Sequence, residues 1–193
     1  MKRIGIYGGS FNPIHIGHIS LAKSLLSEAS LDEIWFMVSP QNPLKQRDGL
    51  LNDQQRFDMV KLALQDEPRL VACNYEFHLP QPSYTLNTLH ALAADYPEDS
   101  FSLLIGGDNW AVFDKWRGYD EIIAHYPIII YPREGSVIDA RQLPSTVRLV
   151  DTPLLNISST EIRNRVAQGL SITGMVPASI EQMVVRLYAG VGK

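Results

Sequence analysis

Short apolar segments rich in β-branched residues alternate along this chain with segments of helical periodicity. Several apolar segments have no polar alternation, which is typical of parallel strands covered on both faces. The predicted strands are Arg3–Tyr7, Glu33–Ser39, Arg69–Asn74, Phe101–Gly106, Pro127–Tyr131 and Val147–Asp151. This β-α alternation predicts an α/β fold, a doubly wound parallel sheet that binds ligands at the carboxyl ends of its strands.

The segments between the strands carry apolar residues at helical spacing. The clearest example follows Pro177 and places Ile180, Met183, Val184 and Leu187 at positions i, i+3, i+4 and i+7, a spacing that forms one apolar stripe. Further helices are predicted at 17–29, 53–66 and 86–95, and another is expected to begin near residue 158. Asn52 and Gln55 form a plausible capping pair for the second of these helices.

Composition restricts the classes of protein to consider. A chain of 193 residues with 45% hydrophobic residues favours one domain, and we expect it to span residues 1–193. The single cysteine, Cys73, permits no intrachain disulfide and suggests a reducing, cytoplasmic location. No apolar run is long enough to span a membrane, and the net charge of −4 argues against a nucleic-acid surface. The sequence does not fix the oligomeric state, and a homo-oligomer is compatible with it.

The strongest local motif is GGSFNPIHIGH, Gly8–His18, directly after the first predicted strand. Gly8 and Gly9 would let the backbone turn sharply and approach a ligand closely. His15 and His18 are three residues apart, so they share one face if the following helix begins this early. Two imidazoles at a helix N-terminus, with its unpaired N–H groups, predict a site for phosphate oxygens. The motif is short, and a glycine pair with two nearby histidines also arises by chance.

A second motif, ISSTEIR, lies at Ile157–Arg163. Ser158 and Glu161 have the spacing of a capping box, so the segment is compatible with nothing more than a well-capped helix. The hydroxyls of residues 158–160 would equally suit a second anion site, with Arg163 one turn further along. The planar guanidinium of arginine binds phosphate in a bidentate manner.

Together and in this order, the two motifs resemble those of the HxGH-type nucleotidyltransferase superfamily, which has a Rossmann-like fold. The resemblance implies that the first motif holds the α-phosphate region of ATP and the second its β- and γ-phosphates. The implied catalytic residues are His15, His18 and Arg163. The implied ATP-binding residues are Gly8, Gly9, Ser10, Phe11, His15, His18, Gly106, Asp108, Ile157, Ser158, Ser159 and Arg163.

Three further segments resemble the bacterial nicotinate-mononucleotide adenylyltransferases: PSYTLNTL from Pro82, IGGDNW from Ile105 and FDKWRGYDEI from Phe113. The resemblance implies that Thr85 and nearby backbone hold the nicotinate carboxylate, and that Trp116 stacks on the pyridine ring. Taken alone, Thr85 could merely cap a helix and Trp116 could belong to the core. The implied mononucleotide-binding residues are Ser10, Asn12, Lys45, Thr85, Trp116 and Arg117.

The sequence departs from the family pattern at three places. In SPQNPLK, Leu44 stands where the family usually has histidine, while Lys45 keeps the positive charge. That change puts a histidine contribution to phosphate binding from this loop in doubt. Ser10 and Asn12 stand where many members have threonine and aspartate, and both keep hydrogen-bonding capacity.

The implied reaction transfers AMP from ATP to nicotinate mononucleotide and releases deamido-NAD and pyrophosphate, a step of NAD biosynthesis. It needs no protein nucleophile, so catalysis would rest on positioning and charge stabilisation. Mg²⁺ is expected to be carried by ATP, because the sequence offers no dedicated carboxylate cage. Three alternatives remain: a phosphopantetheine adenylyltransferase, a non-catalytic nucleotide sensor, and a dinucleotide-dependent oxidoreductase. The first turn reads GGSFNP rather than GxGxxG, which counts against the last.

Overall fold

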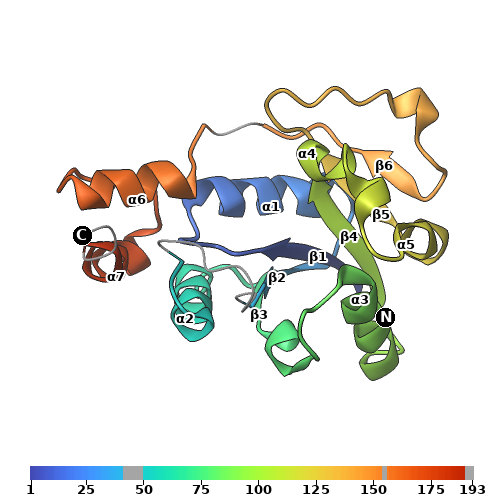
Figure 1. The fold of residues 1–193 in the computed structure, drawn as a ribbon, viewed down its shortest axis with the longest axis horizontal. Helices are drawn as coiled ribbons and strands as arrows, with labels where there is room; N and C mark the ends of the chain where they lie inside the picture. The colour runs from blue at the N-terminus through green and yellow to red at the C-terminus, as the bar shows by residue number, and fades with distance from the viewer. Residues whose placement is uncertain (41–49, 154–155, 190–193) are drawn as a thin grey trace.

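The computed structural model describes residues 1–40, 50–153 and 156–189. Within this part of the chain, six strands pair into one sheet in the order β3-β2-β1-β4-β5-β6 (Figure 1). All neighbouring strands are parallel, which confirms the predicted doubly wound sheet. The strands are β1 (Arg3–Gly9), β2 (Glu33–Val38), β3 (Leu70–Cys73), β4 (Ser100–Gly106), β5 (Ile128–Tyr131) and β6 (Val147–Leu149).

The predicted helices are all present, with small differences at their ends, and two short helices after β4 were not predicted. The helices are α1 (Ile16–Glu28), α2 (Asp53–Ala63), α3 (Thr85–Asp95), α4 (Gly107–Trp110), α5 (Tyr119–His125), α6 (Ser159–Ala167) and α7 (Ala178–Tyr188). Three short 3₁₀ segments are η1 (Tyr75–His78), η2 (Phe113–Lys115) and η3 (Ala140–Gln142). The Asn52 side chain accepts a hydrogen bond from the Gln55 amide at 2.9 Å, as its capping position predicts.

Two apolar cores cover the two faces of the sheet. One contains residues of α1, α2, α6 and α7, and the other contains residues of α3 and α5. Accordingly, α1 and α3 lie on opposite sides of the strands in Figure 1. Alternate residues of one strand serve the two cores: Ile6 of β1 joins one and Tyr7 the other. This explains why the strands read as almost continuously apolar.

The chain leaves the two central strands in opposite directions. From β1 it proceeds through α1 to β2, whereas β4 lies on the other side of β1 and continues to β5. Such a switch in strand order opens a crevice at the carboxyl ends of the strands, where ligands of this fold bind. Gly9 ends β1 and Gly106 ends β4, so the predicted site residues near both strands meet at this crevice.

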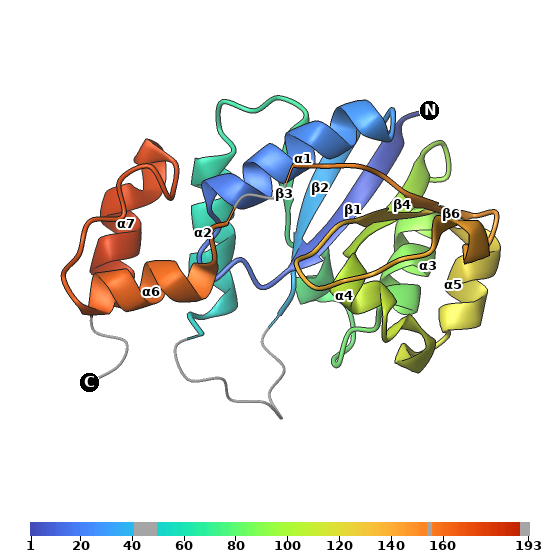
Figure 2. The ribbon, with the colours of Figure 1, turned by 90° about the horizontal axis from the view of Figure 1, so that it is seen from above.

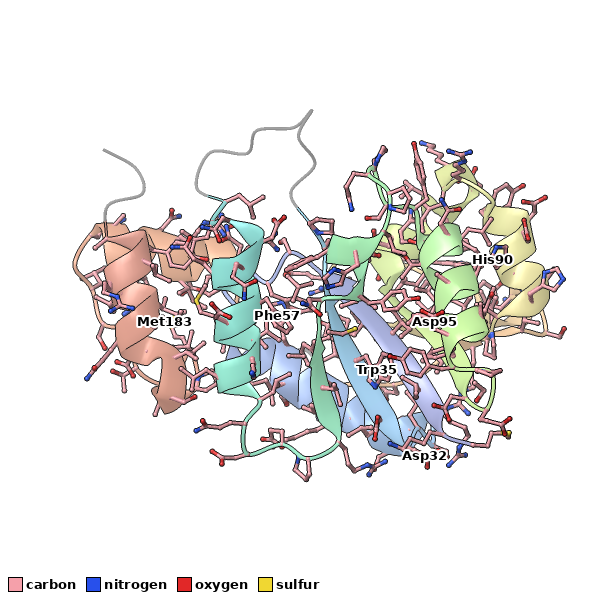
Figure 3. The ribbon with its side chains drawn as sticks, turned by 90° about the horizontal axis from the view of Figure 1, so that it is seen from below. Asp32, Trp35, Phe57, His90, Asp95 and Met183 are labelled. Carbon is pink, nitrogen blue, oxygen red and sulfur yellow. The ribbon has the colours of Figure 1, made fainter. Side chains whose placement is uncertain are left out.

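The helices α6 and α7 pack together beside α2, at one end of the molecule (Figure 2). Phe57 of α2 and Met183 of the neighbouring α7 both pack against the core that contains residues of α1, α2, α6 and α7 (Figure 3). Tyr188, in the last turn of α7, is 1% exposed. This arrangement returns the C-terminal third of the chain to the region of the β1–α1 turn. No helix among the described residues has both the length and the apolar character needed to cross a membrane.

Candidate active site

The turn after β1 differs in one respect from its prediction. Gly8 and Gly9 belong to the strand and pair with β2, so the sharp turn begins only after them. The left-handed position falls instead on Phe11, with a φ of 45°. A side chain on Gly9 would meet the Phe11 ring at 3.0 Å, a tight contact to which the ring would have to adjust.

His15 and His18 lie together at the start of α1. His15 is the N-cap residue and His18 lies one turn on; their rings stack with centroids 3.6 Å apart. Nδ1 of His18 accepts a hydrogen bond from the His15 backbone N–H at 3.2 Å. A neutral His18 must therefore carry its proton on Nε2, where it can be donated to a ligand. Nδ1 of His15 is buried and has no hydrogen-bond partner within the described residues.

Burial and a nearby cation keep both imidazoles neutral. Desolvation, followed by the positive charge of Arg133, lowers the pKa of His15 to about 4. Desolvation, followed by the charges of His15 and Arg133, lowers the pKa of His18 well below its ordinary value. Neutral rings next to a fixed guanidinium suit a phosphate site, because the imidazoles donate hydrogen bonds while Arg133 supplies the charge.

These shifts predict how stability depends on pH. The unfolded chain takes up a proton on His15 near pH 6.5, whereas the folded protein resists it until about pH 4. The free energy of unfolding should therefore fall as the pH drops from 6.5 towards 4, by ~3 kcal/mol from His15 alone. Denaturant unfolding at pH 7, 5.5 and 4.5 measures this loss. His15→Gln should flatten the dependence, and His90→Ala on α3, whose imidazole is exposed, should not. Equal slopes in wild type and His15→Gln would contradict the prediction.

The second motif contacts the first directly. The Ser158 side chain caps α6 by accepting from the Glu161 amide at 3.1 Å. Ser159 Oγ donates to the carbonyl of Pro13 at 2.8 Å. Arg163 donates from Nη1 to the carbonyl of Asn12 at 2.8 Å, and from Nη2 to Thr160 Oγ1 at 3.2 Å. The capping interpretation is therefore correct for Ser158, while the next hydroxyl and the arginine hold the turn of the first motif.

A cavity of about 180 Å³ lies at the carboxyl ends of the central strands. Gly8 and Gly9 form one side of it, and Thr85 and Trp116 also line it. The structure thus brings together the residues predicted to bind the mononucleotide ring and the glycines of the first motif. Tyr131 borders this cavity and also a smaller neighbouring one, whose lining includes His15, His18, Ile157 and Arg133. Because the two cavities adjoin, a ligand group in one would lie beside a ligand group in the other.

The other predicted residues occupy varied positions. Asp108 has a 62% exposed side chain and lies 3.8 Å from Arg133. Arg117 stacks over the ring of Tyr84 at 4.7 Å, beside the shallow hollow lined by Thr85 and Trp116. The helix prediction for Thr85 was one residue short, because α3 begins at Thr85 with Tyr84 as its N-cap. Leu44 and Lys45 lie outside the described residues.

Three predicted contacts are limited by burial or by existing bonds. Asn12 is 6% exposed, and its Oδ1 accepts from the Tyr188 hydroxyl at 2.5 Å and from the Leu51 amide at 3.2 Å. Phe11 is 3% exposed, so it can offer a ligand only its backbone. The predicted row of free helix amides is incomplete, because the Ile16 amide donates to the carbonyl of Met175 at 3.0 Å.

Two residues that line these cavities, Arg133 and Glu76, were not predicted from the sequence. Arg133 stacks over the ring of Tyr131 at 5.3 Å and faces both histidines. Its position two residues after the end of β5 could have revealed it, because residues at that end of a parallel sheet meet the ligand. Glu76 of η1 lines the larger cavity. It accepts from Thr88 Oγ1 at 2.9 Å and from Ser83 Oγ at 3.3 Å, and burial raises its pKa.

Comparison with known proteins identifies the family. The chain matches the sequence profile of the cytidylyltransferase-like family over residues 6–165. It is 45% identical to the probable nicotinate-nucleotide adenylyltransferase of Bacteroides fragilis, over 95% of this chain and 92% of that protein. It is 52% identical to the protein of the same name from Bacteroides thetaiotaomicron, over 83% and 80% of the two chains. The nicotinic acid mononucleotide adenylyltransferase of Plasmodium falciparum, solved in complex with APC, shares the fold with a TM-score of 0.79 and 22% identity, over 98% of each chain. The chain belongs to the cytidylyltransferase-like family and, within it, to the nicotinate-nucleotide adenylyltransferases.

Proposed function

We propose that this protein transfers AMP from ATP to nicotinate mononucleotide, forming deamido-NAD and pyrophosphate, and that it acts in the cytoplasm. The observation that carries the proposal is the pair of adjoining cavities at the carboxyl ends of β1, β4 and β5. One contains Thr85 and Trp116 and the other contains His15 and His18. The relatives named as nicotinate-nucleotide adenylyltransferases support the same activity.

In this mechanism, the phosphate of the mononucleotide attacks the α-phosphorus of ATP in line and pyrophosphate leaves. The protein contributes positioning and charge stabilisation. His18 donates from Nε2 to an α-phosphate oxygen, and His15 lies beside it. Arg133, which faces both rings, offsets the negative charge that accumulates on the phosphates.

We propose that Mg²⁺ enters as part of the MgATP substrate. Across residues 1–40, 50–153 and 156–189, no group of three or more His, Cys, Asp or Glu side chains is arranged to hold a metal ion. A Mg²⁺ ion typically keeps several waters and binds through substrate phosphates. Phosphate oxygens of ATP and water molecules would therefore be its main ligands.

The larger cavity offers a basis for selecting the acid over the amide. Thr85 is the first residue of α3, and the free N–H groups and positive dipole end of a helix start favour a carboxylate. The amide of nicotinamide mononucleotide would instead bring its own donors towards these donors. The nearby carboxylate of Glu76 opposes a second negative charge. The acid preference therefore depends on the start of α3.

We expect nicotinate mononucleotide to be preferred over nicotinamide mononucleotide by at least ~10-fold in kcat/KM, or ~1.4 kcal/mol. Thr85→Ala should mainly reduce this preference, whereas Trp116→Ala should weaken both substrates, because stacking does not distinguish acid from amide. The measurement is pyrophosphate release with MgATP and each mononucleotide, in wild type and both variants. Equal efficiencies in the wild type would remove the carboxylate pocket from the explanation.

The same assay separates the alternative functions. Phosphopantetheine as acceptor tests for a phosphopantetheine adenylyltransferase. If neither acceptor supports pyrophosphate release, only a nucleotide-binding role remains. The proposed function fails if nicotinate mononucleotide supports no pyrophosphate release.

A further inference from the structure

We propose that Arg56 is a positioning residue for AMP transfer: it holds the β1–α1 turn in the conformation that directs the turn's N–H groups to the phosphates. The inference rests on the proposed function. Arg56 is 0% exposed, so its side chain acts on the reaction only through the groups that it binds.

The guanidinium of Arg56 joins separate parts of the chain. Nη1 donates to the carbonyl of Ser10 at 2.6 Å and Nη2 to that of Ser39 at 2.8 Å. Nε donates to the carbonyl of Leu51 at 3.0 Å, and Nη2 also binds Asp53 Oδ1 at 2.6 Å. One planar group thus connects the turn after β1, the residue that follows β2 and the residue before the N-cap of α2. A lysine ammonium on its flexible stem cannot reproduce this forked geometry.

The contact with Ser10 lies next to a strained residue. Phe11 has a φ of 45°, a left-handed conformation that costs a non-glycine residue about 1 kcal/mol or more. Arg56 holds the carbonyl before Phe11, and Arg163 holds the carbonyl of Asn12 after it at 2.8 Å. A strained backbone persists only where its surroundings over-determine it. Two arginines that fix the adjacent carbonyls supply that constraint.

These contacts also set the direction of the amides. In a planar trans peptide the C=O and the following N–H point in opposite directions. The carbonyl of Ser10 points to Arg56, so the N–H of Phe11 points away from it. The carbonyl of Gly9 accepts from the Ser39 amide at 2.9 Å, so the N–H of Ser10 points away from β2. Gly9 and Ser39 both line the larger cavity, where the mononucleotide is proposed to bind.

A matched pair of lysine substitutions tests the proposal. Arg69 provides the control, because it also binds backbone carbonyls, those of Leu31 and Asp32, but at the amino ends of the strands. Arg56→Lys should lower kcat by ~10-fold or more, since small misplacements of reacting groups have large effects. Arg69→Lys should lower the melting temperature while kcat stays within about twofold of wild type. Both variants are assayed with MgATP and nicotinate mononucleotide at saturating concentrations.

The outcomes are distinct from those of the proposed function. If wild type does not form deamido-NAD, the proposed function fails. If wild type is active and Arg56→Lys keeps its kcat within about twofold, Arg56 is not a positioning residue. The proposal is also overturned if both variants lose kcat in proportion to their loss of stability.

Hydrogen exchange on the wild type tests the constraint without any substitution, in case Arg56→Lys does not fold. The Ser39 amide is bonded to Gly9 and the Leu51 amide to Asn12 Oδ1. If Arg56 fixes these segments, both amides should be as protected as those of β1 in the absence of substrates. Exchange at the rate of an unstructured loop would overturn the proposal.

Discussion

His18→Ala should reduce kcat by ~10²–10³, with a smaller effect on the binding of the mononucleotide. The His18 ring is held by the bond between its Nδ1 and the His15 amide at 3.2 Å, so the opposite nitrogen is preorganised as a donor. Loss of one preorganised donor to an oxygen that gains charge in the transition state has an effect of this size. Steady-state kinetics with both substrates varied, together with a binding measurement for nicotinate mononucleotide, separates the two effects.

The surface residue His90 on α3 (Figure 3) provides the control. His90→Ala should leave kcat unchanged. His18→Asn is a useful second variant, because its side-chain amide retains a donor of smaller reach and should recover part of the lost rate. A folded His18→Ala protein with the turnover of wild type would exclude His18 from the mechanism.

Arg163→Lys should lower kcat/KM for ATP by ~10-fold or more although it keeps the positive charge. The guanidinium makes two directed bonds, one to the carbonyl of Asn12 and one to Thr160 Oγ1. A lysine ammonium is a point charge that cannot maintain both in the same geometry. The effect should appear in the affinity for ATP and in kcat, because Arg163 supports the turn that leads to His15 and His18.

Arg165→Lys is the matched control for this prediction. Arg165 lies on the same helix, two residues further along, but its Nε donates to the carbonyl of Ser171 at 2.8 Å and not to the turn. It should keep its ATP kinetics. Unchanged ATP kinetics in Arg163→Lys would mean that positive charge alone suffices at this position.

The strands and the main helices could be predicted because their signals are local. Apolar runs such as Ile128–Tyr131 and the helical stripe of α7 depend on spacing within one segment. The short helix α5 lacked such a signal, since only Ile122 is buried within it. Gly8 and Gly9 were assigned to a turn, but pairing with β2 extends the strand through both. That pairing is a tertiary contact, which a single segment does not reveal.

The site was predictable where residue type and motif coincide, and not where an arginine acts through tertiary contacts. Arg133 has no motif of its own and gains its role only when β5 pairs with β4, the strand next to β1. In α2, the buried face includes the charged Arg56, which is 0% exposed, whereas the neighbouring apolar Phe57 is only partly buried. A charged residue in a core-facing position contradicts hydrophobic patterning, and only its bonds to distant carbonyls explain it.

The β1–α1 turn is held by hydrogen-bond donors from far along the chain, which affects how the newly synthesised chain folds. Ser159, Arg163 and Tyr188 bond to Pro13 and Asn12 across separations of 146, 151 and 176 residues. On the ribosome, the turn emerges long before its partners in α6 and α7 are made. Contacts so distant in sequence form late in folding. A nascent chain should therefore form its sheet before it forms a phosphate site. A translation product interrupted before α6 and α7 should be folded but inactive.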